Sequence, residues 1–432
     1  MKKHVFPIIA LLFVVSAGAW SQSSVSGPLA GDASRATYGD ASQSKNNLTA
    51  TISVSTHVDD NALNDNNNKL TDAISSFAPS FAWSLARQRW SLQTEYAPSF
   101  SYSIQIPRYN TVSHSLSNAL SIRLAQHVDL RLRNSFTRTA DPFGRLSGSQ
   151  LVPGFGVLDQ TNPALFGPPT LYTSEQAGLD LTYMPAAHTT VGVSGSYAVN
   201  YYDDLVASSL GNRDTHMASG RAFVDQKLSP RQSVSVAYNY QVVTSPSNGR
   251  TVSHSVLLFD NWTVNPKFNI SLFAGPQYID SHQIATGVVL PLSSGWSWSA
   301  GGTLSWSGAK TGVSVSAVRR VSDGGGIGGA VQMTDFSGNV SQKIGKKWSA
   351  NFFASYTLNG SNATGTSGNS SLRYFSGGVG VNREIIRNLS FSAKYWYVHQ
   401  SSDNAVPVNA ILADHNRVDI GLSYSFSHPL GR

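Results

Sequence analysis

The chain of 432 residues contains no cysteine. This absence excludes a disulfide framework, a thiolate metal site and a cysteine nucleophile. Charged residues are scarce, at 13% of the chain, yet disorder is not expected because aromatic and β-branched residues are plentiful. The formal net charge is +7, but the basic residues are scattered rather than clustered, which argues against nucleic-acid binding.

The sequence also lacks a long apolar run that could form a transmembrane helix. Residues 1–19 have the pattern of an export signal, with Lys2 and Lys3 before a short apolar core and Ala17-Gly18-Ala19 as the cleavage site. The core is shorter than the roughly 20 residues that a membrane span needs. Residues 20–45 are rich in Ser, Gly and Ala without a period, so we expect a flexible periplasmic lead-in, with a small plug as the alternative.

What the chain does contain is an alternation of apolar and small polar residues. It is clearest in the segment 295–321, where a three-residue turn at 308–310 separates two alternating runs. The apolar set is Trp296, Trp298, Ala300, Leu304, Trp306, Val313, Val315 and Ala317, and serine or threonine occupies most positions between them. Side chains of a strand change face at every residue, so this segment is predicted to be a hairpin with one apolar and one polar face.

The same unit recurs to the end of the chain, without helices that could cover the apolar faces. A closed sheet with its apolar side in lipid and its polar side around water satisfies every copy at once. We therefore predict an all-β fold, a single closed antiparallel up-and-down transmembrane β-barrel over residues 46–428, with about 18 strands. Sixteen strands is the alternative if a weak strand such as 214–228 or 330–344 is wrongly assigned, and a soluble β-sandwich is a minor competitor.

Short and long connections alternate along the chain, as in a barrel with tight periplasmic turns and longer external loops. The short ones are predicted at 86–89, 125–127, 184–188, 229–231, 265–267, 308–310, 345–347 and 383–388. The longer ones, rich in Gly, Ser, Asn and Pro, include 59–69, 139–172, 203–214, 244–250, 281–294, 322–329, 359–370 and 401–415.

The last predicted strand carries Val418, Ile420, Leu422, Tyr424 and Phe426 on one face. It resembles the aromatic-ended closing strand of bacterial outer-membrane β-barrels, porins in particular, although residues 427–432 follow the phenylalanine. The resemblance implies export to the outer membrane of a Gram-negative envelope and contact with outer-membrane lipid and lipopolysaccharide. It further implies recognition of this strand by the barrel-assembly machinery, and it is compatible with a homotrimer. It is architectural and carries no active-site motif.

Parity assigns mostly serine, threonine and asparagine to the inner face. Such small side chains cannot fill a barrel of this many strands, so a water-filled passage is expected. Its selectivity would depend on the few charged inner residues, namely Arg123, Arg131, Arg133, Arg221, Arg320 and Lys394 against Glu95, Asp129, Asp180, Asp225 and Asp335. The expected function is passive diffusion of small hydrophilic solutes with a mild anion preference.

The strand pair around the turn 125–127 allows two registers. If Ala125 faces Asp129, Arg123 lies opposite Arg131, and this like-charge pair would hold anions. If Leu124 faces Val128, Arg123 lies opposite Asp129 and the charges are largely neutralised. The sequence leaves both registers open.

The longest connection, 139–172, is rich in Pro and Gly, and its charged or aromatic candidates are Asp141, Phe143, Arg145 and Asp159. Its position resembles that of the third loop of porins, which folds into the barrel and narrows the channel. A loop that lies over the mouth of the barrel is the alternative. Long loops without secondary structure are often functional, which keeps the inward-folding loop as a candidate.

Catalysis, cofactors and metals are not expected. The fragment Thr-Val-Ser-His-Ser occurs at 111–115 and 251–255, but alternation directs His114 and His254 outward and the flanking serines inward. The Asp and Asn residues of 59–66 could hold a surface cation, yet their spacing does not match an EF-hand, and a solvated loop is favoured. The alternative functions are an export barrel for polysaccharide or another secretion system and, in another class, a barrel enzyme or surface adhesin.

Overall fold

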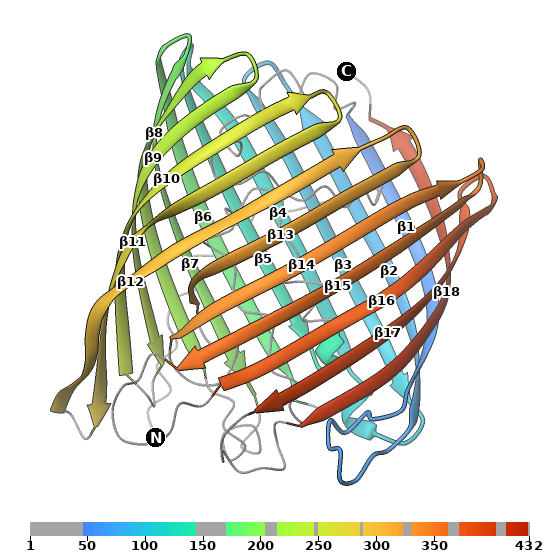
Figure 1. Ribbon diagram of the computed structural model, residues 1–432. Helices are drawn as coiled ribbons and strands as arrows, with labels where there is room; N and C mark the ends of the chain where they lie inside the picture. Colours follow the sequence, from blue (N-terminus) through green and yellow to red (C-terminus); the bar gives the residue numbers. More distant parts are fainter. Residues whose placement is uncertain are drawn as a thin grey trace, which may run out of the picture.

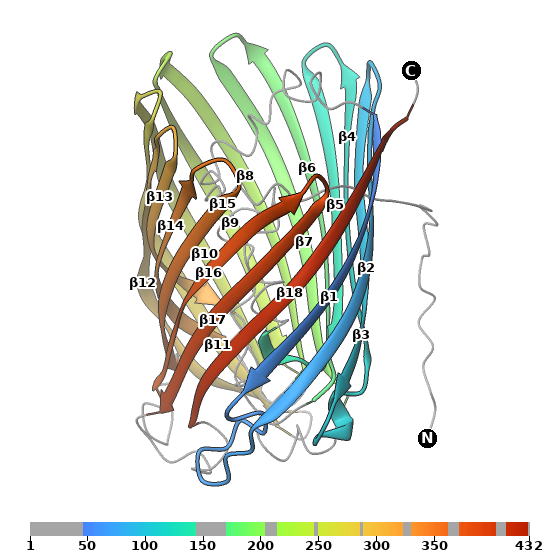
Figure 2. The same cartoon turned by 90° about the vertical axis from the view of Figure 1, so that its right-hand side faces the viewer.

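The structure is a computed structural model that describes residues 46–143, 170–203, 214–245, 249–285, 288–322, 330–361, 371–402 and 412–430. In this part of the chain, 18 antiparallel strands form one sheet that closes into a barrel (Figure 1, Figure 2). The predicted fold class and the preferred strand number are therefore confirmed. The predicted export signal, 1–19, and the lead-in, 20–45, lie outside the described residues.

The strands in chain order are β1 (Asn47–Asp59), β2 (Asp72–Ala86), β3 (Trp90–Ser103), β4 (Val112–Ala125), β5 (Val128–Thr139), β6 (Tyr172–Ala186), β7 (Thr189–Tyr202), β8 (Thr215–Ser229), β9 (Gln232–Ser245), β10 (Gly249–Asn265), β11 (Phe268–Ala285), β12 (Val288–Ser307), β13 (Thr311–Ser322), β14 (Val331–Ile344), β15 (Trp348–Ser361), β16 (Ser371–Ile386), β17 (Leu389–Ser402) and β18 (Ala413–Pro429). A short 3₁₀ helix, η2 (Pro107–Tyr109), lies between β3 and β4.

The barrel is closed by β1 and β18. These strands pair along the whole of β1, from Asn47 opposite Pro429 to Asp59 opposite Arg417. Figure 2 shows the two strands side by side. Closure leaves no unpaired edge, so the backbone N–H and C=O groups of the wall are satisfied within the sheet, as a lipid environment requires.

The eight predicted short turns each connect an even-numbered strand to the odd-numbered strand that follows it. They lie together at one end of the barrel (Figure 1). Two of them use residues with positive φ, Gly345 at 70° and Asn388 at 73°, the residue types that adopt this conformation most readily. One predicted connection is wrong: 281–294 is mostly strand. β11 continues to Ala285 and β12 begins at Val288, because the ladder persists past a register shift at Ser281 and His282 despite the local Ser, Gly and Pro content.

The outer face carries the large apolar side chains. On β12, Trp298 and Leu304 are exposed, whereas the intervening Ser299 and Thr303 are buried. Trp296 and Trp306 lie on the same face ten residues apart. At about 3.3 Å per residue and the usual strand tilt, this places them about 25 Å apart along the barrel axis, the height of the apolar band of a transmembrane barrel. The exterior is therefore that of a barrel that spans a bilayer.

Within the described ranges, no helix has the length and apolar character needed to cross a membrane.

Candidate functional site

The barrel interior is the candidate site, and its wall is held together by inward hydroxyl groups. Serine and threonine side chains of neighbouring strands form hydrogen bonds to one another along the wall. The pairs are Thr51–Ser425 at 2.9 Å, Ser76–Ser101 at 3.1 Å, Ser196–Ser219 at 2.7 Å, Ser316–Ser337 at 2.6 Å and Ser355–Ser376 at 2.8 Å. Alternation along the strands places these side chains on the inner face.

The structure decides the register around the first arginine. Arg123 of β4 lies opposite Asp129 of β5, with a register shift before Ala125 pairs with Val128. The Nε atom of Arg123 lies 3.8 Å from an Asp129 carboxylate oxygen, and both side chains are about one-third exposed. The like-charge pairing of Arg123 with Arg131 is therefore wrong, because the register shift absorbs the extra turn residue.

The two inward arginines of β5, Arg131 and Arg133, face a carboxylate on β6. Asp180 lies opposite Arg131 in the register. It also forms a short ion pair with the guanidinium of Arg133, whose side chain is almost fully buried. The positive charge expected on this wall is thus largely balanced by Asp129 and Asp180.

Arg221 and Arg320 lie in the part of the wall formed by β8 to β13. Arg221 on β8 places its guanidinium carbon 5.0 Å from the ring centroid of Phe223 and 4.9 Å from that of Phe259. Arg320 on β13 is buried and lines the same hollow as Arg221. Most of the other lining residues are polar and include Asn239, Gln241, Ser253, Ser255, Gln277 and Ser299.

Lys394 and Glu95 lie in further sectors of the wall. Lys394 on β17 is opposite Asp419 of β18, and Glu95 on β3 is opposite Ala82 of β2 and Ser117 of β4. The predicted selectivity residues are therefore spread around the wall and do not converge on one ring.

The interior also contains an apolar region, although alternation assigns mostly small polar residues to the inner face. The inward residues Phe223, Ala237, Leu257, Phe259, Phe273 and Val318 form a buried apolar cluster. The rings of Phe259 and Phe273 are stacked with centroids 5.4 Å apart. The unbroken apolar run Val256-Leu257-Leu258-Phe259 indicates this arrangement, because both faces of β10 are apolar there.

The start of the longest connection lies inside the barrel. Asp141 follows β5, but its carboxylate accepts hydrogen bonds from Nη1 of Arg417 on β18 at 2.9 and 3.0 Å. Phe143 is buried against Tyr374, Val398 and Ala413, which belong to β16, β17 and β18. Four strands, β1 to β4, separate β18 from β5 in the wall. The candidates Arg145 and Asp159 lie outside the described residues.

We call Asp141, Phe143 and Arg417 the latch. The guanidinium carbon of Arg417 lies 4.5 Å from the centroid of the Phe143 ring, and its Nε donates to Asp419 at 2.9 Å. Burial by itself would raise the pKa of Asp141, but the charge of Arg417 and its hydrogen bonds hold that pKa below the ordinary value. Asp141 is therefore a carboxylate at neutral pH.

The neighbourhood of the latch was not predicted from the sequence. Asp59 Oδ1 lies 3.0 Å from Nδ1 of His415, which is fully buried. The ring of His415 meets the Phe143 ring edge-on at 5.6 Å. Alternation places His415 and Arg417 on the inner face of β18, but their partners come from a loop and from β1, and only closure of the barrel brings these together.

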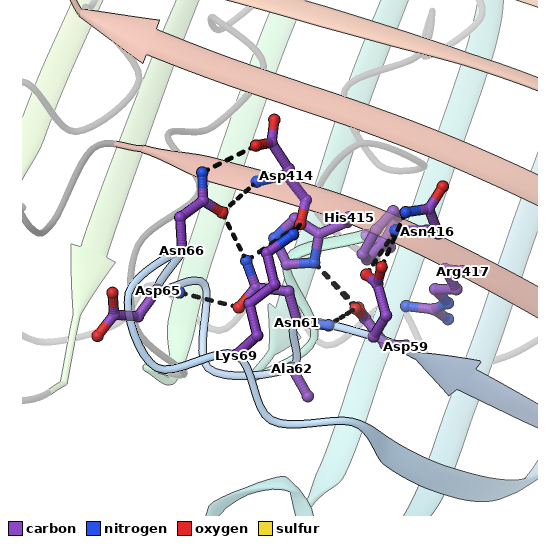
Figure 3. Close-up of polar contacts among 12 residues, drawn as sticks. Asp59, Asn61, Ala62, Asp65, Asn66, Lys69, Asp414, His415, Asn416 and Arg417 are labelled. Carbon is purple, nitrogen blue, oxygen red and sulfur yellow. Dashed lines mark hydrogen bonds and ion pairs between the residues drawn. The ribbon is translucent and has the colours of Figure 1, made fainter.

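The connection between β1 and β2 forms further hydrogen bonds to β18, close to the latch (Figure 3). Asn66 exchanges hydrogen bonds with Asp414, donating to the carboxylate at 2.9 Å and accepting from the backbone N–H at 2.8 Å. The Asn61 amide donates to the backbone oxygen of Asp414 at 3.1 Å, and the Asp60 carboxylate accepts two hydrogen bonds from Asn416. The Asp/Asn-rich segment thus holds the end of β18 that lies away from the short turns. In the described part of the chain, no group of three or more His, Asp or Glu side chains is arranged to hold a metal ion.

The repeated Thr-Val-Ser-His-Ser fragment lies at the start of β4 and near the start of β10. The hydroxyl of Tyr96 lies 2.9 Å from Nδ1 of His114, and that of Tyr238 lies 2.7 Å from Nδ1 of His254. In the register, Tyr96 pairs with Leu116 and Tyr238 pairs with Val256, so each tyrosine is offset from its histidine by two residues. Both histidines therefore bond an outward tyrosine rather than a serine nucleophile.

No protein-family model and no curated protein sequence matches the chain. The fold is similar to that of the outer membrane protein OpdK from Pseudomonas aeruginosa, at 9% identity and a TM-score of 0.45, over 88% of this chain and 99% of that one. Acinetobacter baumannii OccAB3 has 10% identity and a TM-score of 0.45, over 88% of this chain and 99% of that one. The ferric citrate transporter FecA has 11% identity and a TM-score of 0.45, over 87% of this chain and 64% of that one.

Proposed function

We propose that the protein is an outer-membrane channel for passive diffusion of small hydrophilic solutes, and that the latch narrows its external end. The observation that carries this proposal is a closed 18-stranded wall with an apolar band outside, hydroxyl-lined sectors inside, and a loop segment anchored on the inner wall. A barrel of this size is wider than its own side chains can fill. The polar interior would therefore give hydrophilic solutes a path across the membrane, which the lipid does not provide.

The proposal includes a mild anion preference carried by Arg221 and Arg320. Arg123 and Arg133 each face a carboxylate partner, Asp129 or Asp180, so their contribution to the field in the passage is reduced. Arg221 and Arg320 line one hollow with uncharged polar side chains, and the charge of Arg320 also acts on the carboxylate of Asp335 on β14. We expect the two arginines together to outweigh this carboxylate, so the preference would depend on that side of the wall.

The proposed location determines the remaining partners. The outward apolar band would contact outer-membrane lipid and lipopolysaccharide. The outward residues Tyr424 and Phe426 of β18, which are exposed, would present the closing strand to the barrel-assembly machinery. A homotrimer is the oligomeric state proposed for the barrel, with the apolar outer face available for contacts between copies.

The test is conductance of the purified barrel in planar lipid bilayers. The expected result is stepwise conductance, with a reversal potential in a KCl gradient that favours chloride mildly. Arg221→Gln is expected to shift that potential toward the cation, whereas Arg138→Gln, on the outer face and paired with Asp203 at 2.9 Å, is expected to leave it unchanged. A correctly folded barrel that never conducts would contradict the channel and would favour the export alternative.

A further inference from the structure

The external end of the outer face carries a row of aromatic side chains on adjacent strands. Tyr240 of β9 stands opposite His254 of β10, His254 opposite Tyr278 of β11, and Tyr278 opposite Trp296 of β12. The rings of Tyr240 and His254 are 5.1 Å apart, and those of Tyr278 and Trp296 are 5.5 Å apart. The row is therefore a nearly continuous aromatic platform.

The row faces the surroundings of the barrel. Trp296 is 77% exposed, more than any other large hydrophobic side chain of the described residues. On β10, Ser253 and Ser255 on either side of His254 are buried against the interior. With Trp306 at the other edge of the apolar band, the row lies at the external boundary between hydrocarbon and head groups.

Two arginines flank the row on the same face. Arg319 of β13 places its guanidinium carbon 4.6 Å from the ring centroid of Trp298, two residues from Trp296. Arg250 of β10 lies four residues beyond His254, opposite His282 of β11. The acidic neighbour is Asp280, 3.7 Å from Nδ1 of His282. This sector therefore combines aromatic rings with an excess of cationic and N–H donor groups.

The chemistry of these groups indicates the ligand. Aromatic faces stack on the apolar faces of sugar rings, and guanidinium groups bind phosphate through paired, charge-assisted hydrogen bonds. When Tyr238 donates to Nδ1 of His254, across 2.7 Å, the imidazole carries its proton on Nε2 and can donate to a ligand as well. A molecule with both sugar and phosphate at the membrane surface fits this set of groups.

We propose that Tyr240, His254, Tyr278, Trp296, Arg250 and Arg319 form a binding site for the phosphorylated sugar head group of an outer-leaflet glycolipid. We call these six residues the rim site. The inference depends on the proposed membrane location but is independent of the channel activity. Binding of the glycolipid would anchor the barrel in the outer leaflet at β9–β13, on the outside of the wall that carries Arg221 and Arg320.

The structure provides a matched control at the opposite boundary. Arg383 of β16 lies over the ring of Trp348, 4.9 Å from its centroid. This pair has nearly the same cation–π geometry as Arg319 and Trp298, but it lies next to the periplasmic turns. A general effect of losing an outward arginine would appear in variants of both Arg319 and Arg383. Loss of the rim site would appear only in the Arg319 variant.

The test is native mass spectrometry of the full mature barrel, extracted in mild detergent, stripped of lipid and titrated with bisphosphorylated lipid A. The expected result is that Arg319→Gln and Arg250→Gln each weaken binding about tenfold, the effect of losing one charge-assisted contact. Arg383→Gln is expected to bind as the parent does. Dephosphorylated lipid A is expected to bind the parent about tenfold more weakly, and excess inorganic phosphate is expected not to displace lipid A.

Trp296→Ser removes an exposed ring without changing charge, so it tests the platform in a barrel whose interior is unaltered. It is expected to weaken binding of both lipid A forms severalfold. Equal binding by the Arg319 and Arg383 variants, equal binding of the two lipid forms, or displacement by inorganic phosphate would overturn the proposal. A dimer or trimer that Trp296→Ser abolishes while lipid A binding persists would also overturn it and identify the face as a contact between copies.

Discussion

Arg417 holds Asp141 with two hydrogen bonds from one nitrogen, at 2.9 and 3.0 Å, although the two residues are 276 positions apart in the chain. Arg417 is on the strand that closes the barrel, and Asp141 is at the start of the longest connection. The contact therefore joins the last strand to the start of the connection that we propose narrows the channel. If this contact sets the width of the external end, its removal has effects on permeation that differ from simple destabilisation.

The first prediction concerns the latch itself. Asp141→Asn removes the charge that Arg417 binds, so the loop segment is expected to detach more often and to widen the passage. Single-channel conductance is expected to rise roughly twofold. The control is Asp203→Asn, which removes an exposed ion pair with Arg138 on the outer face and is expected to leave conductance unchanged. Identical conductance of the two variants would show that the latch does not limit ion flow.

The second prediction concerns pH. The pKa of Asp141 is below its ordinary value, so the ionised carboxylate stabilises the folded, latched state. That stabilisation is complete above the unfolded value of about 3.9 and is lost as the pH falls through the lower, folded value. Conductance is therefore expected to stay constant from pH 8 to pH 5 and to rise only in stronger acid. In Asp141→Asn it is expected to be raised at every pH and to lack this acid step.

The third prediction compares two ion pairs of the inner wall. Arg133 is almost fully buried beside Asp180, whereas Arg123 and Asp129 are partly exposed and 3.8 Å apart. Arg133→Leu leaves a carboxylate without its buried partner and is expected to lower the free energy of unfolding by about 3 kcal/mol. Arg123→Leu is expected to lower it by less than about 1 kcal/mol. Urea unfolding of the barrel in lipid vesicles measures both, and equal losses would contradict the difference in burial.

The fourth prediction concerns the apolar cluster inside the wall. Phe259 is 1% exposed and stacks on Phe273, so Phe259→Ala is expected to lower the free energy of unfolding by about 3–5 kcal/mol. Ser316→Ala removes one inward hydroxyl that bonds Ser337 at 2.6 Å, and a loss of about 1 kcal/mol is expected. If Phe259→Ala had no greater effect than Ser316→Ala, this part of the interior would be solvated rather than packed.

The fold could be predicted from the sequence because alternation is a local property of each strand. Trp296, Trp298 and Trp306 already identify the lipid face of β12, and the serine positions identify its inner face. The turn positions were likewise evident, since each turn lies between two alternating runs. The prediction of a loop at 281–294 was wrong. Ser, Gly and Pro suggest a loop locally, but pairing with the partner strand determines where a strand ends.

The sequence alone therefore determined which side chains face lipid and which face the interior, because parity along a strand needs only neighbouring residues. It could not determine which inward residues meet. The pairing of Arg123 with Asp129 depended on one residue of register at a turn, and the contact of Arg417 with Asp141 depended on closure of the whole wall. Such contacts join segments distant in the chain, so only the tertiary structure decides them.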